Sequence, residues 1–146
     1  MLAEWYCPAQ GLEIDHAGYT AAWETVLAPI MIRQRPGVTV LRDYHAENVM
    51  LVAGRTGVAH LGLLDFQDAL AGHPAYDLAS VLEDARRDVP PALERALLDR
   101  YTAATGNAAA FERAYWALAA QRNTRILGVF VRLWKRDGKP HYRAFQ

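Results

Sequence analysis

A short β-prone region inside an otherwise helical chain restricts the possible folds more than any other feature. The runs Val49–Val52 and Val58–Leu64 flank the turn sequence Gly54-Arg55-Thr56-Gly57 and predict a β-hairpin. Before them, Val38–Leu41 predicts a short strand that leads into a loop. With 146 residues, the chain is long enough for one domain core. We therefore expect a single domain over residues 1–146, mostly α-helical with one small β-hairpin.

Helical periodicity surrounds this region on both sides. Apolar residues recur at helical spacing in four segments, each bounded by capping residues or by Pro and Gly. The first segment runs from Asp15 to Ile30; Pro29 should kink or end its helix, and Pro36-Gly37 closes it. The others run from Pro74 to Pro90, from Leu93 to Gly106 and from Phe111 to Gly138. Residues 1–12 contain Pro8 and Gly11 as breakers and are expected to be irregular and linker-like.

The composition argues against several classes of protein. The formal net charge is zero and there is no basic run, so nucleic acid binding is not expected. A single cysteine, Cys7, excludes an intramolecular disulfide and favours a reducing compartment. The start of the chain lacks a signal-peptide pattern, and the longest helical segment carries polar residues throughout. We expect a soluble, cytoplasmic protein that has no membrane partner.

Three side chains follow the order and spacing of a kinase catalytic loop and the metal-binding residue beyond it. Asp43 stands on a tight loop, where a carboxylate can accept the proton of an acceptor hydroxyl. The Asn48 amide oxygen and the Asp65 carboxylate are hard ligands suited to Mg²⁺. The hairpin should bring Asp65 back near Asn48. This set predicts phosphoryl transfer, and the alternative is that Asp43 and Asn48 only cap turns.

Other polar residues near this set have two interpretations each. His45 can support the loop through a hydrogen bond or take part in chemistry, and Glu47 can reach substrate or remain a solvated loop charge. Asp68 can face the same site or occupy an outer turn position. The pair Arg86-Arg87 is expected on a solvated helix face.

On the last helix, Arg122 falls on the apolar stripe and needs a partner, which is either a bound anion or sugar, or an internal carboxylate. Asn123 and Arg125 flank it and could add sugar contacts. The four tryptophans are interpreted as core or interface aromatics, with sugar stacking as the alternative.

The segments Leu41–Asn48, Leu63–Ala69 and Gly72–Ala79 resemble the aminoglycoside phosphotransferase-like (choline kinase-like) family. The stretches Gln121-Arg122-Asn123 and Arg125–Gly128 are similar to its anomeric amino-sugar kinases, which phosphorylate N-acetylmuramate and N-acetylglucosamine. The resemblance covers nearly the whole chain but only the C-terminal lobe of the kinase-like fold.

The resemblance implies an ATP- (or GTP-) and Mg²⁺-dependent transfer of the γ-phosphoryl group to a hydroxyl of a small substrate, with an amino sugar as the leading candidate. Asp43 matches the catalytic Asp, Asn48 and Asp65 match the magnesium ligands, and Asp77, with His45, matches the structural support of the catalytic loop. Glu47, Asp68, Arg122 and Asn123 become possible substrate-binding residues. The alternatives are an aminoglycoside, choline or homoserine kinase, or a non-catalytic remnant that serves as an interaction module.

The chain departs from the family pattern in two places. Leu41 stands where the family usually has an architectural His. No glycine-rich strand-turn or phosphate-binding Lys precedes the motif, so the N-terminal lobe that covers ATP is expected from a longer gene. The chain also stops at Ala144–Gln146 within a new amphipathic segment. We therefore expect truncation at both ends and an isolated chain that is inactive without the missing lobe.

Overall fold

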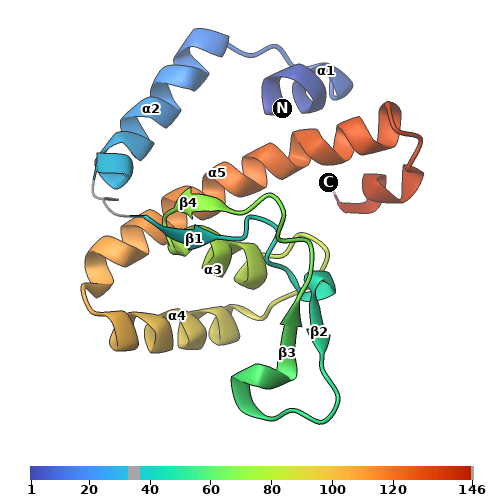
Figure 1. Ribbon diagram of the computed structural model, residues 1–146. Helices are drawn as coiled ribbons and strands as arrows, with labels where there is room; N and C mark the ends of the chain where they lie inside the picture. Colours follow the sequence, from blue (N-terminus) through green and yellow to red (C-terminus); the bar gives the residue numbers. More distant parts are fainter. Residues whose placement is uncertain (33–36, 146) are drawn as a thin grey trace. The chain divides into compact units, whose positions relative to one another are not determined.

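The computed structural model describes residues 1–32 and 37–145 and divides the chain into two compact units (Figure 1). The helical unit comprises Met1–Arg33 and Ala117–Gln146, and the mixed unit comprises Gln34–Trp116. Helices predominate and the sheets are small and antiparallel, which confirms the expected mostly helical class. Among the described residues, no helix combines the length and apolar character needed to cross a bilayer.

The strands that the structure describes all lie in the mixed unit and form two antiparallel pairs. β2 (Val49–Leu51) pairs with β3 (Leu61–Leu63), which confirms the hairpin. β3 is shorter than expected because Gly57–His60 forms a 3₁₀ turn before it. β1 (Val38–Val40) pairs with β4 (Leu70–Gly72), a strand that the sequence did not indicate.

The α-helices that the structure describes in the mixed unit are α3 (Ala75–Leu82), α4 (Pro91–Thr105) and the first turns of α5 (Ala108–Lys135). The expectation that the first of them would continue to Pro90 is wrong. Asp84 lies just beyond α3, and its Oδ1 accepts a hydrogen bond from the backbone N–H of Arg86 at 3.1 Å. This local side-chain bond replaces helical hydrogen bonding and ends the helix.

The core of the mixed unit lies where α4 turns back into α5 (Figure 1). Leu98 and Tyr115 are fully buried there. The Tyr115 hydroxyl donates to Glu94 Oε1 at 2.6 Å, and the rings of Tyr101 and Phe111 lie 4.8 Å apart. These contacts hold α4 against the start of α5 and provide a fixed base for the rest of the unit.

The helical unit begins with a π-helical turn (Leu2–Tyr6) and the short helix α1 (Cys7–Ala9). The expectation of an irregular segment over residues 1–12 is wrong here. Pro8 falls in the first turn of α1, a position where proline is tolerated, so it does not break the helical segment. Cys7 is buried, which anchors the segment.

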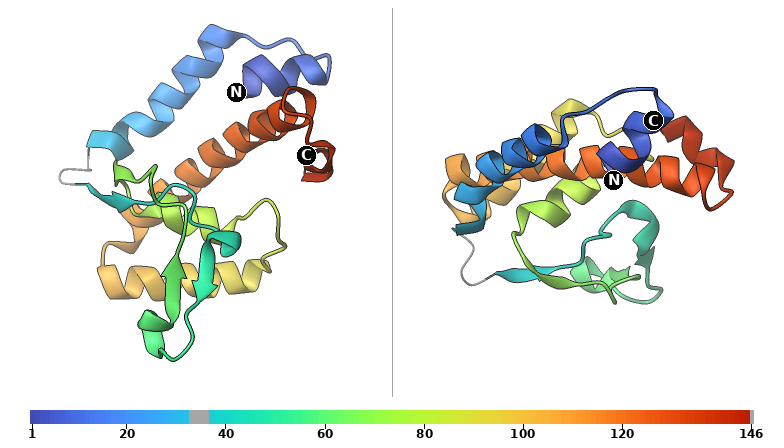
Figure 2. Two further views of the ribbon diagram at one scale, coloured as in Figure 1. Left: turned by 45° about the vertical axis from the view of Figure 1, so that its right-hand side comes forward. Right: turned by 90° about the horizontal axis from the view of Figure 1, so that it is seen from above.

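α2 (His16–Ile32) and the second part of α5 run side by side within the helical unit (Figure 2). Asp15 caps α2 as expected, because its Oδ1 accepts hydrogen bonds from the N–H groups of Ala17 and Gly18 at 3.1 and 3.0 Å. Pro29 lies inside α2 and does not end it, because the helix continues to Ile32. Pro36, expected to close the segment, lies outside the described residues.

At Gly128, α5 lies close to the backbone at the start of the chain. A Cβ atom at this position would collide with the backbone of Met1 and Leu2, so only glycine fits. Farther along α5, the ring of Phe130 packs against the ring of Tyr142, with centroids 5.1 Å apart. Tyr142 lies on the 3₁₀ helix Pro140–Phe145. The helical unit therefore has its own packed end.

Candidate active site

The loop between β1 and β2 holds Asp43 in a defined position. The Asp43 carbonyl oxygen accepts hydrogen bonds from the His45 backbone N–H at 3.1 Å and from Asn48 Nδ2 at 2.9 Å. The Asp43 side chain itself is exposed. Hydrogen bonds within the loop thus hold the Asp43 backbone in place, while its exposed carboxylate is accessible to a ligand.

Asn48 and His45 orient each other. Asn48 Nδ2 lies 3.3 Å from His45 Nε2, in addition to its bond to the Asp43 carbonyl. With the amide nitrogen donating to both groups, His45 Nε2 accepts and the ring proton lies on Nδ1. Burial and the nearby Arg86 guanidinium lower the pKa of His45, which favours this neutral ring. The Asn48 Oδ1 atom is then the part of the amide available to a metal ion.

The β2–β3 hairpin brings Asp65 next to Asn48. Val49 pairs with Leu63, and the Leu64 N–H donates to the Asn48 carbonyl at 2.9 Å. Asp65 follows directly and is exposed, with Gln67 Nε2 donating to its Oδ1. The Asn48 amide and the Asp65 carboxylate therefore lie at the same end of the β2–β3 hairpin.

Arg42, which precedes Asp43, and Asp65 itself have strained backbones. Arg42 has φ of 70° and Asp65 has φ of 58°, in the left-handed region that costs a residue with a Cβ about 1–2 kcal/mol. For Arg42, hydrogen bonds to the surrounding backbone offset this strain. Asp77 accepts hydrogen bonds from the N–H groups of Leu41 at 2.7 Å and Arg42 at 3.0 Å. Ser80, fully buried on α3, donates to the Arg42 carbonyl at 3.4 Å.

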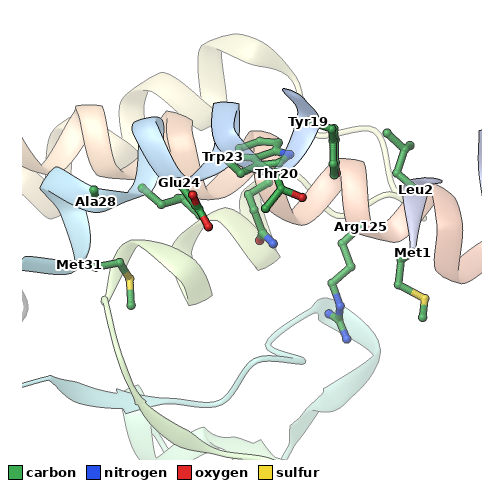
Figure 3. Close-up of a pocket in the computed structure, with 11 residues that line it drawn as sticks. Met1, Leu2, Tyr19, Thr20, Trp23, Glu24, Ala28, Met31 and Arg125 are labelled. Carbon is green, nitrogen blue, oxygen red and sulfur yellow. The ribbon is translucent and has the colours of Figure 1, made fainter. Parts of the chain in front are cut away.

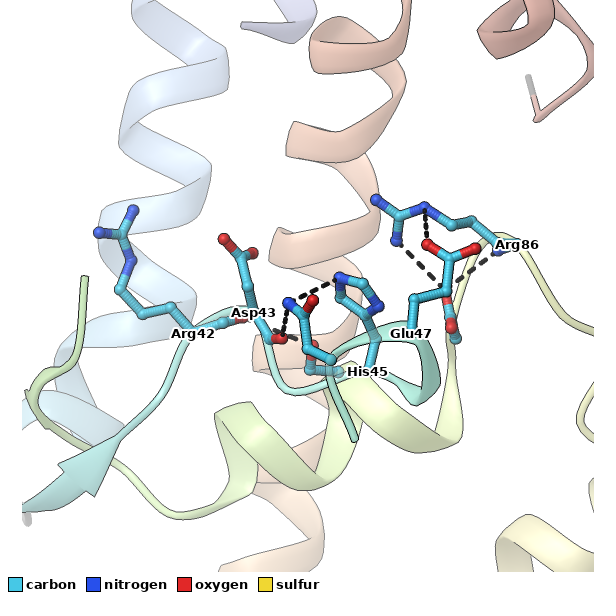
Figure 4. A network of polar contacts seen from close by, with 8 residues as sticks. Arg42, Asp43, His45, Glu47 and Arg86 are labelled. Carbon is cyan, nitrogen blue, oxygen red and sulfur yellow. Dashed lines mark hydrogen bonds and ion pairs between the residues drawn. The ribbon is translucent and has the colours of Figure 1, made fainter. Parts of the chain in front are cut away.

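Asp68 and Glu47 both have basic partners. Arg42 Nη1 lies 3.9 Å from Asp68 Oδ2, and both side chains are partly exposed. Glu47 Oε2 lies 3.7 Å from Arg86 Nε (Figure 4). These carboxylates are therefore parts of ion pairs at the edge of the loop.

Arg86 connects this loop to a buried carboxylate. Its Nη1 lies 3.4 Å from Asp84 Oδ1, and Asp84 is only 3 % exposed. The interpretation of Arg86 as part of a solvated helix face is wrong, because the residue lies beyond the end of α3 and its side chain is 22 % exposed. The sequence offered no local signal for this link, since it depends on the burial of Asp84.

The remaining predicted residues, Arg122 and Asn123, lie on α5 in the helical unit, whereas all the others belong to the mixed unit. Arg122 is 4 % exposed and has an interaction partner within the chain. A guanidinium buried to this extent must be paired.

The oxygen atoms of Asn48 and Asp65 are suitable ligands for a magnesium ion that also binds phosphates. Among the described residues, no group of three or more His, Cys, Asp or Glu side chains could hold a metal by itself. Mg²⁺ commonly takes one or two protein ligands and completes its shell with water and substrate phosphates. Asn48 Oδ1 and the Asp65 carboxylate are the two residues that would hold it.

Comparison with known protein families shows the family to which this chain belongs. Residues 4–116 match the model of the phosphotransferase enzyme family. The chain belongs to this family. The match covers the whole loop and hairpin just described, together with Asp77 and α3.

Curated relatives narrow the resemblance within the phosphotransferase enzyme family. The chain is 46% identical to the N-acetylmuramate/N-acetylglucosamine kinase of Caulobacter vibrioides, over 99% of this chain and 41% of the relative. It is 39% identical to the protein of that name from Neisseria meningitidis, over 82% of this chain and 36% of the relative. For the Pseudomonas aeruginosa protein of that name, the identity is 33%, over 97% of this chain and 44% of the relative. The resemblance to amino-sugar kinases is confirmed, and the chain spans less than half the length of these relatives.

Proposed function

We propose that this chain is part of the C-terminal lobe of an ATP- and Mg²⁺-dependent kinase that phosphorylates a hydroxyl of N-acetylmuramate, N-acetylglucosamine or a similar amino sugar. One observation carries the proposal. Asn48 supports the Asp43 backbone with its amide nitrogen and stands beside Asp65 at the end of the hairpin. In this proposal the base and the two metal ligands belong to one loop and hairpin.

Each residue has a role in this proposal. The exposed Asp43 carboxylate would orient the acceptor hydroxyl and accept its proton. Asn48 and Asp65 would hold the Mg²⁺, and Mg²⁺–ATP, when bound, would supply the phosphoryl group. Asp77 and His45 keep the loop in place. Glu47 and Asp68, already paired with arginines, act at the rim of the site.

The lengths of the relatives support the further proposal that a longer protein supplies the N-terminal lobe covering ATP. The single, free cysteine is consistent with the cytoplasm, where ATP is available.

An acceptor panel tests the function. Protein expressed from the complete reading frame is incubated with ATP and Mg²⁺ and with N-acetylmuramate, N-acetylglucosamine, kanamycin, choline or homoserine, and phosphorylated product is measured by mass spectrometry. We expect product with the two N-acetyl sugars. Product only with a cationic acceptor assigns the protein to another branch of the family. No product with any acceptor favours a non-catalytic interaction module.

A further inference from the structure

A pocket of about 620 Å³ lies within the helical unit, between α2 and α5 (Figure 3). None of the residues in the loop and hairpin described above lines it. Its volume falls in the range of small-molecule sites, which are mostly apolar with a few polar groups that fix orientation. The pocket has this character, because apolar side chains form most of its wall and a few polar groups project from the two helices.

One side of the pocket carries two aromatic rings. Tyr19 and Trp23 lie one turn apart on α2, with ring centroids 6.3 Å apart and ring planes at 80°. Both side chains are only partly buried, so their surfaces remain available to a ligand. The flat faces of indole and phenol rings suit the C–H face of a pyranose ring, because that face is apolar while the hydroxyls point outward.

Polar groups line the pocket from both helices. Gln121 and Arg125 are four residues apart on α5 and so share one face of that helix, and Glu24 projects from α2. Within the described part of the chain, none of these three side chains has a hydrogen bond or ion-pair partner. Figure 3 shows the Arg125 side chain extending away from α5.

The chemistry of these groups points to one class of ligand. A guanidinium pairs with a carboxylate through two parallel hydrogen bonds. The Gln121 amide can donate to the carbonyl of an acetamido group and accept from its N–H. The Glu24 carboxylate accepts hydrogen bonds from sugar hydroxyls. Together with the rings, these groups match an N-acetylated amino sugar that also carries a carboxylate.

We propose that this pocket binds the amino-sugar acceptor, with Arg125 pairing with the carboxylate of N-acetylmuramate and Trp23 stacking on its ring. The assignment rests on the proposed function, since it names the acceptor site of that kinase. It also makes Arg125 the residue that distinguishes N-acetylmuramate from N-acetylglucosamine, which has no carboxylate.

Calorimetric titration of the protein expressed from the complete reading frame, with each sugar and without nucleotide, tests the proposal. We expect Arg125→Gln to weaken N-acetylmuramate binding roughly 10- to 100-fold, as for loss of a charge-assisted hydrogen-bonded pair, and N-acetylglucosamine binding less than about twofold. Arg125→Lys keeps the charge but cannot form the two parallel hydrogen bonds, so its affinity for N-acetylmuramate should be intermediate. Trp23→Leu should weaken both sugars to a similar degree. Arg113→Gln, an exposed arginine on α5 outside the pocket, is the matched control and should change neither.

Two results would overturn the assignment: no binding of either sugar by the unmutated protein, or an Arg125→Gln variant with an unchanged ratio of the two affinities. Circular dichroism of each variant verifies its fold. The proposed function can fail separately, because this titration involves no phosphoryl transfer. If the acceptor panel gives phosphorylated sugar while Arg125→Gln leaves the sugar preference unchanged, the kinase activity stands and the pocket is wrong.

Discussion

Asn48 Nδ2 donates a 2.9 Å hydrogen bond to the carbonyl oxygen of Asp43, five residues earlier in the same loop. The same amide group therefore fixes the loop with its nitrogen and leaves its oxygen for a metal ion. In the proposed site this side chain therefore has two roles, and mutation can separate them.

Asn48→Ala removes both roles, whereas Asn48→Asp keeps an oxygen ligand and loses the hydrogen bond to Asp43. We expect Asn48→Ala to raise the Mg²⁺ concentration for half-maximal activity by at least about tenfold. Asn48→Asp should retain near-normal Mg²⁺ dependence with a lower kcat. Initial rates over a Mg²⁺ series measure both. An unchanged Mg²⁺ dependence in Asn48→Ala would remove Asn48 from the metal site.

Asp77 offsets the strain at Arg42 by accepting two backbone hydrogen bonds. In Asp77→Asn, one of those N–H groups faces an amide N–H instead of an oxygen. We expect the free energy of unfolding to fall by about 1–3 kcal/mol in urea denaturation. Asp88→Asn, at an exposed carboxylate in the same unit, is the control and should change it by less than about 0.5 kcal/mol. Equal values for the two variants would contradict the supporting role of Asp77.

Arg86 balances the buried Asp84 carboxylate. Arg86→Gln leaves that charge poorly compensated, and we expect a loss of about 2 kcal/mol of unfolding free energy, less than for a fully buried pair because Arg86 still contacts water. Its exposed neighbour provides the control, since Arg87→Gln should cost less than about 0.5 kcal/mol. If the two variants unfold at the same urea concentration, Arg86 is a surface residue.

His73 should make stability depend on pH. Its Nδ1 accepts a hydrogen bond from the Ala75 N–H at 3.2 Å, and burial lowers its pKa. The unfolded chain therefore binds a proton near pH 6.5, at a pH where the folded chain does not. The stabilising contribution is complete above that pH and is lost as the pH falls through the lowered pKa.

Urea denaturation at pH 7.5 and pH 5.5 measures this effect. We expect His73→Asn, which keeps an acceptor for the Ala75 N–H but cannot titrate, to lose less stability than the unmutated protein over this interval. Part of the dependence should remain, because burial lowers the pKa of His45 in the same direction. Identical pH dependence in the two proteins would show that His73 does not titrate in this way.

The sequence predicted the parts of the structure that depend on local pattern. The hairpin follows from two β-prone runs around a glycine turn, and positive φ at Gly54 and Gly57 agrees with that turn. Its return geometry then places Asp65 beside Asn48. The Asp15 cap and the end of α4 at Gly106 were likewise visible as residue signals.

Nonlocal contacts account for what was missed. β4 has only Leu70, Ala71 and Gly72 and forms because β1 pairs with it, not because these residues favour a strand. The link from Glu47 through Arg86 to Asp84 depends on burial of a carboxylate far along the chain. The pocket combines residues of α2 and α5, which lie about a hundred positions apart in the sequence.

Transfer of labelled phosphate from ATP to N-acetylmuramate by the complete protein and its Asp43→Asn variant tests the central claim most directly. Asp43 is exposed and its backbone is held by other groups, so the variant should keep its fold and its affinity for the sugar. We predict that its kcat falls by about 10²–10⁴, the usual contribution of a positioned base. Transfer by the folded variant at the rate of the unmutated protein would contradict the assignment of Asp43 and of the site built around it.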